Sequence, residues 1–197
     1  MTTYRPRVTS RRLFFACALA SGCGDAGSPS SGGTDSTGSV VEIDGTMVDL
    51  VKPQLWVQLG EDADPLRDHR PASVNCPLGV GWLVEVTGFE VNTGGCNYGA
   101  FTQPTLREIV PGAQISLNLY HFDLVAAEPA TAHAVIMAGD HVLLEREVDI
   151  PGKAMVYEVE LVADFALAAG EPVVFHLHNH GQNTWTLASI QVEVEDP

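Results

Sequence analysis

Three histidines alternate with other residues near the end of the chain, at His176, His178 and His180. Residues two apart in a β-strand share a face, so their imidazoles are expected to point the same way. Neutral imidazole is a common ligand of Zn²⁺ and Cu²⁺. The first and third lie about 13 Å apart in an extended strand. We therefore expect His178 to share an ion with only one of its two neighbours.

A metal site would need a further ligand from another strand or loop, and His133, His121 and acidic side chains are the candidates. His121 falls in phase with the apolar positions 115, 117 and 119, which argues against it. The weak alternation around His133 leaves its face open. The alternative is a polar outer sheet face that uses histidine only for hydrogen bonding.

Aromatic residues form a second candidate set, because exposed rings can stack on sugars. Tyr120 alternates with apolar positions and is expected on an outer face. Trp185 is the other ligand-binding candidate, although it and Trp82 lie in apolar segments that also fit a core position.

No familiar catalytic pattern is found in the sequence. It has no Gly-x-Ser-x-Gly elbow, no His-Glu-x-x-His helix and no Gly-rich phosphate or dinucleotide loop. A hydrolase could still assemble acidic residues from distant strands, so catalysis stays open without a residue to assign to it.

In the segments that contain these residues, apolar positions alternate with a period of two, which indicates β-strands. Pro-, Gly- and Asn-containing turns separate them. The expected strands are 81–91, 113–120, 131–138, 142–148, 155–161, 173–180 and 185–194. Short strands at this spacing predict an all-β, antiparallel β-sandwich with a jelly-roll arrangement. A single helical turn is expected at 164–169, and the acidic segment 61–68 is expected to be an exposed connection.

Cys76 and Cys96 are expected to form a disulfide, since both belong to the globular part of a chain with export features. The bond would join the turn at 92–95 to the segment before Trp82. Two buried free thiols are the alternative.

The N-terminal segment has the features of an export signal: a basic start, a short apolar stretch and small residues before Cys23. The heptad from Ser10 to Ala16 resembles the twin-arginine export signal, matching at Ser10, Arg11, Arg12 and Phe14. That resemblance implies export of a folded domain. An ordinary Sec signal with two chance arginines is the alternative.

Residues 20–23, Ala-Ser-Gly-Cys, resemble the lipobox of bacterial lipoproteins. The resemblance implies a lipid on Cys23 and a signal peptide at 1–22. Ten of the sixteen residues from Gly24 to Ser39 are Gly or Ser, a composition typical of a flexible tether. The predicted organisation is a signal at 1–22, the lipidated cysteine and tether at 23–39, and a β-sandwich domain at 40–197.

The charge is asymmetric. Four of the ten Lys and Arg precede Cys23 and all 25 Asp and Glu follow it, so the mature part would carry a formal charge of −19. Such a surface argues against nucleic-acid partners and favours cations.

The sequence thus predicts a lipid-anchored, extracytoplasmic, non-catalytic module that binds a carbohydrate or a protein. The first alternative is a Zn- or Cu-binding protein that uses His176, His178, His180 and His133. The second is a hydrolase on the same scaffold.

Overall fold

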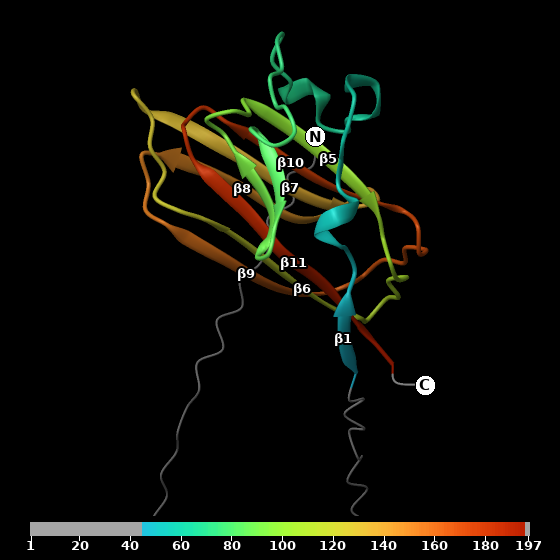
Figure 1. Ribbon diagram of the computed structural model, residues 1–197. Coiled ribbons are helices and arrows are strands. Elements are labelled where there is room, and N and C mark those ends of the chain that lie inside the picture. The colour runs from blue at the N-terminus through green and yellow to red at the C-terminus, as the bar shows by residue number, and fades with distance from the viewer. Residues whose placement is uncertain (1–44, 196–197) are drawn as a thin grey trace, which may run out of the picture. The chain divides into compact units, whose positions relative to one another are not determined.

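The computed structural model describes residues 45–195, which form two antiparallel β-sheets (Figure 1). The strands are β1 (Thr46–Asp49), β2 (Val57–Gln58), β3 (Trp82–Glu85), β4 (Gly88–Asn92), β5 (Tyr98–Pro104), β6 (Gln114–His121), β7 (Ala130–Ala138), β8 (His141–Ile150), β9 (Met155–Val162), β10 (Pro172–Asn179) and β11 (Thr184–Val194). The all-β expectation is confirmed.

The strand order is that of a jelly roll. Sheet A has the order β3-β4-β11-β6-β9, with β1 also paired to β11, and sheet B has the order β2-β5-β10-β7-β8. From β4 to β11 every connection crosses between the sheets except the one from β7 to β8. This gives the two interleaved Greek keys that define a jelly roll.

The core lies between the inner faces of the two sheets. On β6 the residues that belong to it alternate strictly with partly exposed ones. On β6, Ile115, Leu117, Leu119 and His121 are buried while the intervening residues are partly exposed. The rings of Phe89 on β4 and Phe101 on β5 lie 4.9 Å apart across the sandwich. Aromatic contact of this kind adds to the burial of apolar surface.

Several elements differ from the sequence predictions. The segment 81–91 is a hairpin of β3 and β4, not one strand. It turns at Val86–Thr87, and Gly88 has φ of +145° beside the Leu187 carbonyl of β11, where a Cβ would clash. Strands β1, β2 and β5 were not predicted from the sequence, and residues 164–169 form no helical turn.

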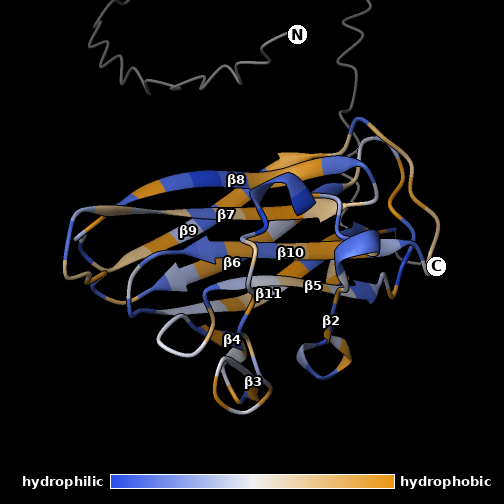
Figure 2. Cartoon of the chain, turned by 90° about the horizontal axis from the view of Figure 1, so that it is seen from above, coloured by the Kyte–Doolittle hydropathy of each residue, from blue (hydrophilic) through white to orange (hydrophobic). Residues whose placement is uncertain are grey.

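The acidic segment is more structured than expected. It contains two 3-10 turns, η2 (Glu61–Ala63) and η3 (Arg67–His69), and a third, η1 (Pro53–Leu55), precedes it. We call residues 60–70 the strap. Figure 2 views the side of the molecule where its hydrophilic turns lie in front of sheet B. No helix in the part of the chain described is long and apolar enough to cross a membrane.

Candidate functional site

The predicted histidines of β10 lie on the outer face of sheet B. Val173, Phe175 and Leu177 belong to the core, as the alternation predicts. His178 pairs with Tyr98 of β5 on one side and with His133 of β7 on the other. The face of His133, open from the sequence, is therefore this same outer face.

The strap covers part of this face. The hydroxyl of Tyr98 donates a hydrogen bond to the Asp64 carboxylate at 2.5 Å, and its oxygen lies 3.1 Å from the Leu66 carbonyl oxygen. Arg70 lies 3.2 Å from the same carboxylate. Burial, followed by the hydrogen bond to Asp64, raises the pKa of Tyr98 above its ordinary value. These contacts hold the strap against β5, so the segment is not the open connection that its sequence suggests.

The imidazoles on this face divide into two groups. The ring centres of His69 and His133 lie 4.6 Å apart, those of His133 and His176 5.3 Å, and those of His69 and His176 5.9 Å. The ring of His178 is instead 4.4 Å from that of His180. His69 was missed in the sequence because it follows an acidic loop and belongs to no periodic pattern.

His176 is buried, with 0% of its surface exposed, although it points away from the core. Burial first, and then the neighbouring His133, His69 and His178, lower its pKa to about 3. Burial is also the largest cause of the lowered pKa of His178. These histidines are therefore neutral at physiological pH.

The ligand set predicted from the sequence is not assembled. Among residues 45–195, no three His, Cys, Asp or Glu side chains are arranged to hold a metal ion. His178 and His180 lie together, but His176 is turned toward the strap, which a pattern confined to one strand cannot reveal.

An aromatic pair lies on the outer face of sheet A. Tyr120 on β6 is half-buried and its ring meets that of Phe122 edge to face, with centres 6.0 Å apart. Phe122 is 61% exposed, and Val156, which faces Tyr120 from β9, is 56% exposed. The outward orientation of Tyr120 agrees with its expected phase, while Phe122 was not singled out in the sequence because it lies just beyond the strand.

Hydrogen-bonding groups flank the aromatic pair. Thr186 of β11 lies between Tyr120 and Glu90 of β4 in the register of the sheet. Asn118 is two residues before Tyr120 on the same face and pairs with Glu158. Burial, followed by repulsion from Glu85, raises the pKa of Glu90.

The prediction that Trp185 binds a ligand is wrong, because its side chain is fully buried. Its register with Val91 and His121 places it on the inner face of sheet A. The alternative noted from its apolar neighbours, a core position, is the correct one.

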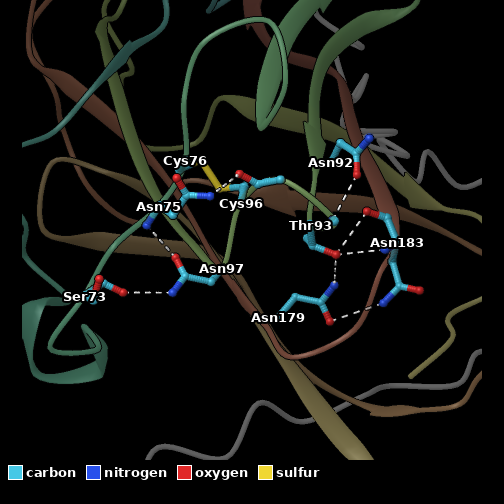
Figure 3. Close-up of a disulfide and its surroundings, with 11 residues drawn as sticks. Ser73, Asn75, Cys76, Asn92, Thr93, Cys96, Asn97, Asn179 and Asn183 are labelled. Atoms are coloured by element: carbon cyan, nitrogen blue, oxygen red, sulfur yellow. Dashed lines mark hydrogen bonds between the residues drawn. A yellow bond between two sulfur atoms is a disulfide. The ribbon is translucent and has the colours of Figure 1, made fainter. Parts of the chain in front are cut away.

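The disulfide between Cys76 and Cys96 is present (Figure 3). Asn97 supports it: its side chain donates a hydrogen bond to the Ser73 carbonyl and accepts one from the backbone N–H of Asn75. The bond joins the turn before β5 to the loop before β3, as expected.

The surface also carries an open pocket of about 740 Å³, lined by residues 126–131, Asp149 and His180. It contains no aromatic side chain. The exposed Phe and half-buried Tyr rings of the aromatic pair thus lie outside this pocket.

No protein family and no curated protein sequence matches the chain. Solved structures resemble it only in shape. A carbohydrate-binding module described for specific mannan recognition has a TM-score of 0.44 at 12% identity, over 77% of this chain and 96% of that one. A family 11 carbohydrate-binding module from Clostridium thermocellum, in complex with a mixed-linked tetrasaccharide, has 0.36 at 10%, over 73% and 94%.

The enzymatically active domain of bacteriophage CBA120 tailspike protein 4 has a TM-score of 0.38 at 14% identity, over 73% of this chain and 22% of that one. With scores this low, none of these structures bears on what this chain binds. The jelly-roll assignment rests on the strand order itself.

Proposed function

We propose that this protein is an exported, lipid-anchored binding module that holds a carbohydrate on the outer face of sheet A. The observation that carries the proposal is the exposed edge-to-face pair of Tyr120 and Phe122. An exposed aromatic ring beside a polar sheet face offers the apolar platform on which the C–H face of a sugar stacks.

The surrounding groups suit the hydroxyls of the same sugar. Asn118 can donate and accept hydrogen bonds, and the Glu90 carboxylate can accept them. Asn118 lies on the same strand as Tyr120, and Glu90 lies two strands away on β4, separated from Tyr120 by the buried Thr186 of β11. Stacking would supply affinity, and these polar groups would select the orientation of the hydroxyls.

The export and anchoring part of the proposal rests on sequence, because residues 1–44 lie outside the described residues. Residues 1–22 would direct export and Cys23 would carry the lipid. The disulfide supports an oxidising, extracytoplasmic location, where such bonds persist.

Native affinity electrophoresis of the full chain in gels containing mannan, mixed-linkage β-glucan or xylan tests the binding function. We expect at least one polysaccharide to retard the wild type, and Phe122→Ala and Tyr120→Ala to abolish the retardation. Val142→Ala removes a side chain that is 53% exposed on sheet B and serves as the matched control.

If all three gels leave the wild type unretarded, the carbohydrate assignment is wrong. If both aromatic variants are still retarded, the polysaccharide binds at a place other than this face of sheet A. Release of reducing ends from the polysaccharide would replace binding with hydrolysis, for which Glu90 would be the first residue to test.

Metabolic labelling with palmitate tests the anchor. The wild type is expected to incorporate the label and to fractionate with membranes, whereas Cys23→Ser should do neither, because stable anchoring needs the acyl chains. Labelling that persists in Cys23→Ser would refute the assignment, whatever the outcome of the polysaccharide experiment.

A further inference from the structure

The spacing of three imidazoles beneath and within the strap fits a shared metal ion. A nitrogen-bound Zn²⁺ lies about 2.1 Å from its ligand atom and so about 3.2 Å from the ring centre, which puts the centres of tetrahedral ligands about 5.3 Å apart. The ring centres of His69, His133 and His176 are separated by 4.6, 5.3 and 5.9 Å. The three rings thus already form a triangle of the required size.

Two of these rings carry buried nitrogens that have no hydrogen-bond partner within residues 45–195 and could coordinate a metal ion. Neither ring nitrogen of His176 has a hydrogen-bond partner among the described residues, and the same holds for Nδ1 of His133. A buried polar atom without a partner is unfavourable, because it has lost its hydration without gaining a hydrogen bond. Metal coordination would compensate that cost at a ring with no exposed surface.

His133 makes the outer hydrogen bond that metal-bound histidines commonly make. Its Nε2 lies 3.0 Å from the Glu145 carboxylate of β8. A carboxylate accepts the N–H of an imidazole, which leaves the lone pair on Nδ1. Carboxylates in this outer position fix the ring and raise its basicity in many metal sites.

We propose that His69, His133 and His176 form a three-histidine site for a first-row divalent cation such as Zn²⁺, which fastens the strap to β7 and β10. His69 belongs to the exposed strap, so the ion can enter from solvent and the ring can rotate about its side-chain bonds. That rotation is required, because the three side chains do not yet converge on one point.

The charges around the site allow a cation to bind. Arg70, the residue that follows His69 on the strap, is paired with Asp64 at 3.2 Å. Glu145 lies beside His133, and Glu147 faces it from β8. This ligand set differs from the one that the sequence suggested, since it uses His69 and leaves out His178 and His180.

Calorimetric titration with ZnCl₂ of the full chain, purified without a histidine tag and stripped with a chelator, tests the proposal. We expect one ion per chain at micromolar or tighter affinity, at least tenfold weaker binding in His69→Ala and His133→Gln, and a rise in the unfolding temperature with Zn²⁺ that His69→Ala abolishes. His69 is exposed, so its replacement leaves the fold intact even if replacement of His176 does not.

His141→Ala is the matched control, because its ring stacks on Phe165 at 3.9 Å, away from the cluster, and Zn²⁺ affinity should stay within about twofold. Millimolar or weaker affinity of the wild type would overturn the proposal. So would binding that depends on His178 and His180 but is unchanged in His69→Ala, which would assign the ion to that pair at the end of β10.

Discussion

Tyr98 and Asp64 lie 34 residues apart in the sequence, yet the Tyr98 hydroxyl donates a 2.5 Å hydrogen bond to the buried Asp64 carboxylate. Arg70 pairs with the same carboxylate, so one acidic side chain fastens both ends of the strap's second turn to β5. This contact closes the outer face of sheet B over His176. It makes the strap a structured cover and not a solvated loop.

Tyr98→Phe should loosen the strap. The substitution removes the hydrogen bond that joins the Asp64 carboxylate to β5 and leaves that carboxylate with Arg70 and the backbone N–H of Leu66, both in the strap. A buried acceptor that loses a partner costs about 1–3 kcal/mol. Trypsin should therefore cleave faster after Arg67, with the products identified by mass. Tyr120→Phe removes a hydroxyl from the opposite sheet and should leave the cleavage rate unchanged. Equal rates in wild type and Tyr98→Phe would mean that this hydrogen bond does not hold the strap.

Alternation along single strands could be read from the sequence, and it predicted on which face of the sheet each side chain lies. It placed His121 inside, Tyr120 outside and the β10 histidines opposite Phe175, because one buried face imposes a period of two. It failed where a third layer covers the sheet. β5 is buried on both faces, since the strap lies over Tyr98, and its lack of alternation hid it.

The histidine cluster could not be predicted for a related reason. His69 meets His133 and His176 only because contacts distant in sequence fold the strap back, and no local pattern encodes such a contact. The disulfide could be predicted from the sequence, because the argument needs only the number of cysteines in the domain and an oxidising compartment.

Removal of the disulfide should destabilise the protein by about 3 kcal/mol on the chain-entropy account, because the bond closes a loop between residues separated by 20 positions. Urea unfolding of Cys76→Ser/Cys96→Ser, compared with wild type under reducing and non-reducing conditions, measures the difference. Reduction should bring the wild type close to the double variant. Titration of the denatured, unreduced protein should find neither Cys76 nor Cys96 as a free thiol, and detection of both would contradict the bond.

Thr93 is expected to be a further anchor of the loops at this end of the sandwich (Figure 3). Its hydroxyl oxygen lies 2.7 Å from the Gly181 carbonyl and accepts hydrogen bonds from the Asn179 side chain at 2.6 Å and the Asn183 backbone at 2.8 Å. Thr93→Val keeps the shape but removes every one of these bonds. It should cost about 2–4 kcal/mol in urea unfolding, since buried donors lose their acceptor.

Thr102→Val is the control for Thr93, because it deletes one partly buried hydroxyl that donates to the Val173 carbonyl at 2.9 Å. Its cost should be about 1 kcal/mol. If the two variants were equally stable, the network around Thr93 would contribute no more than an ordinary hydrogen bond.

Glu90 should make the protein less stable as the pH rises. Burial, followed by repulsion from Glu85, raises its pKa in the folded state above the ordinary 4.5. The folded state then holds the proton more tightly than the unfolded state does. The stability associated with this group is fully present below about pH 4 and declines as the pH rises through the raised value.

Glu90→Gln should therefore be more stable than wild type at pH 7, by less than about 1 kcal/mol given its partial exposure, and indistinguishable from it at pH 3.5. Thermal unfolding at both pH values measures the crossover. Glu158→Gln removes the same charge from an exposed position of the same face and should show a smaller difference. A Glu90→Gln variant less stable than wild type at pH 7 would mean that the ionised carboxylate makes a favourable contact on this face. The group would then be poised to accept a hydrogen bond from a ligand without first losing a proton.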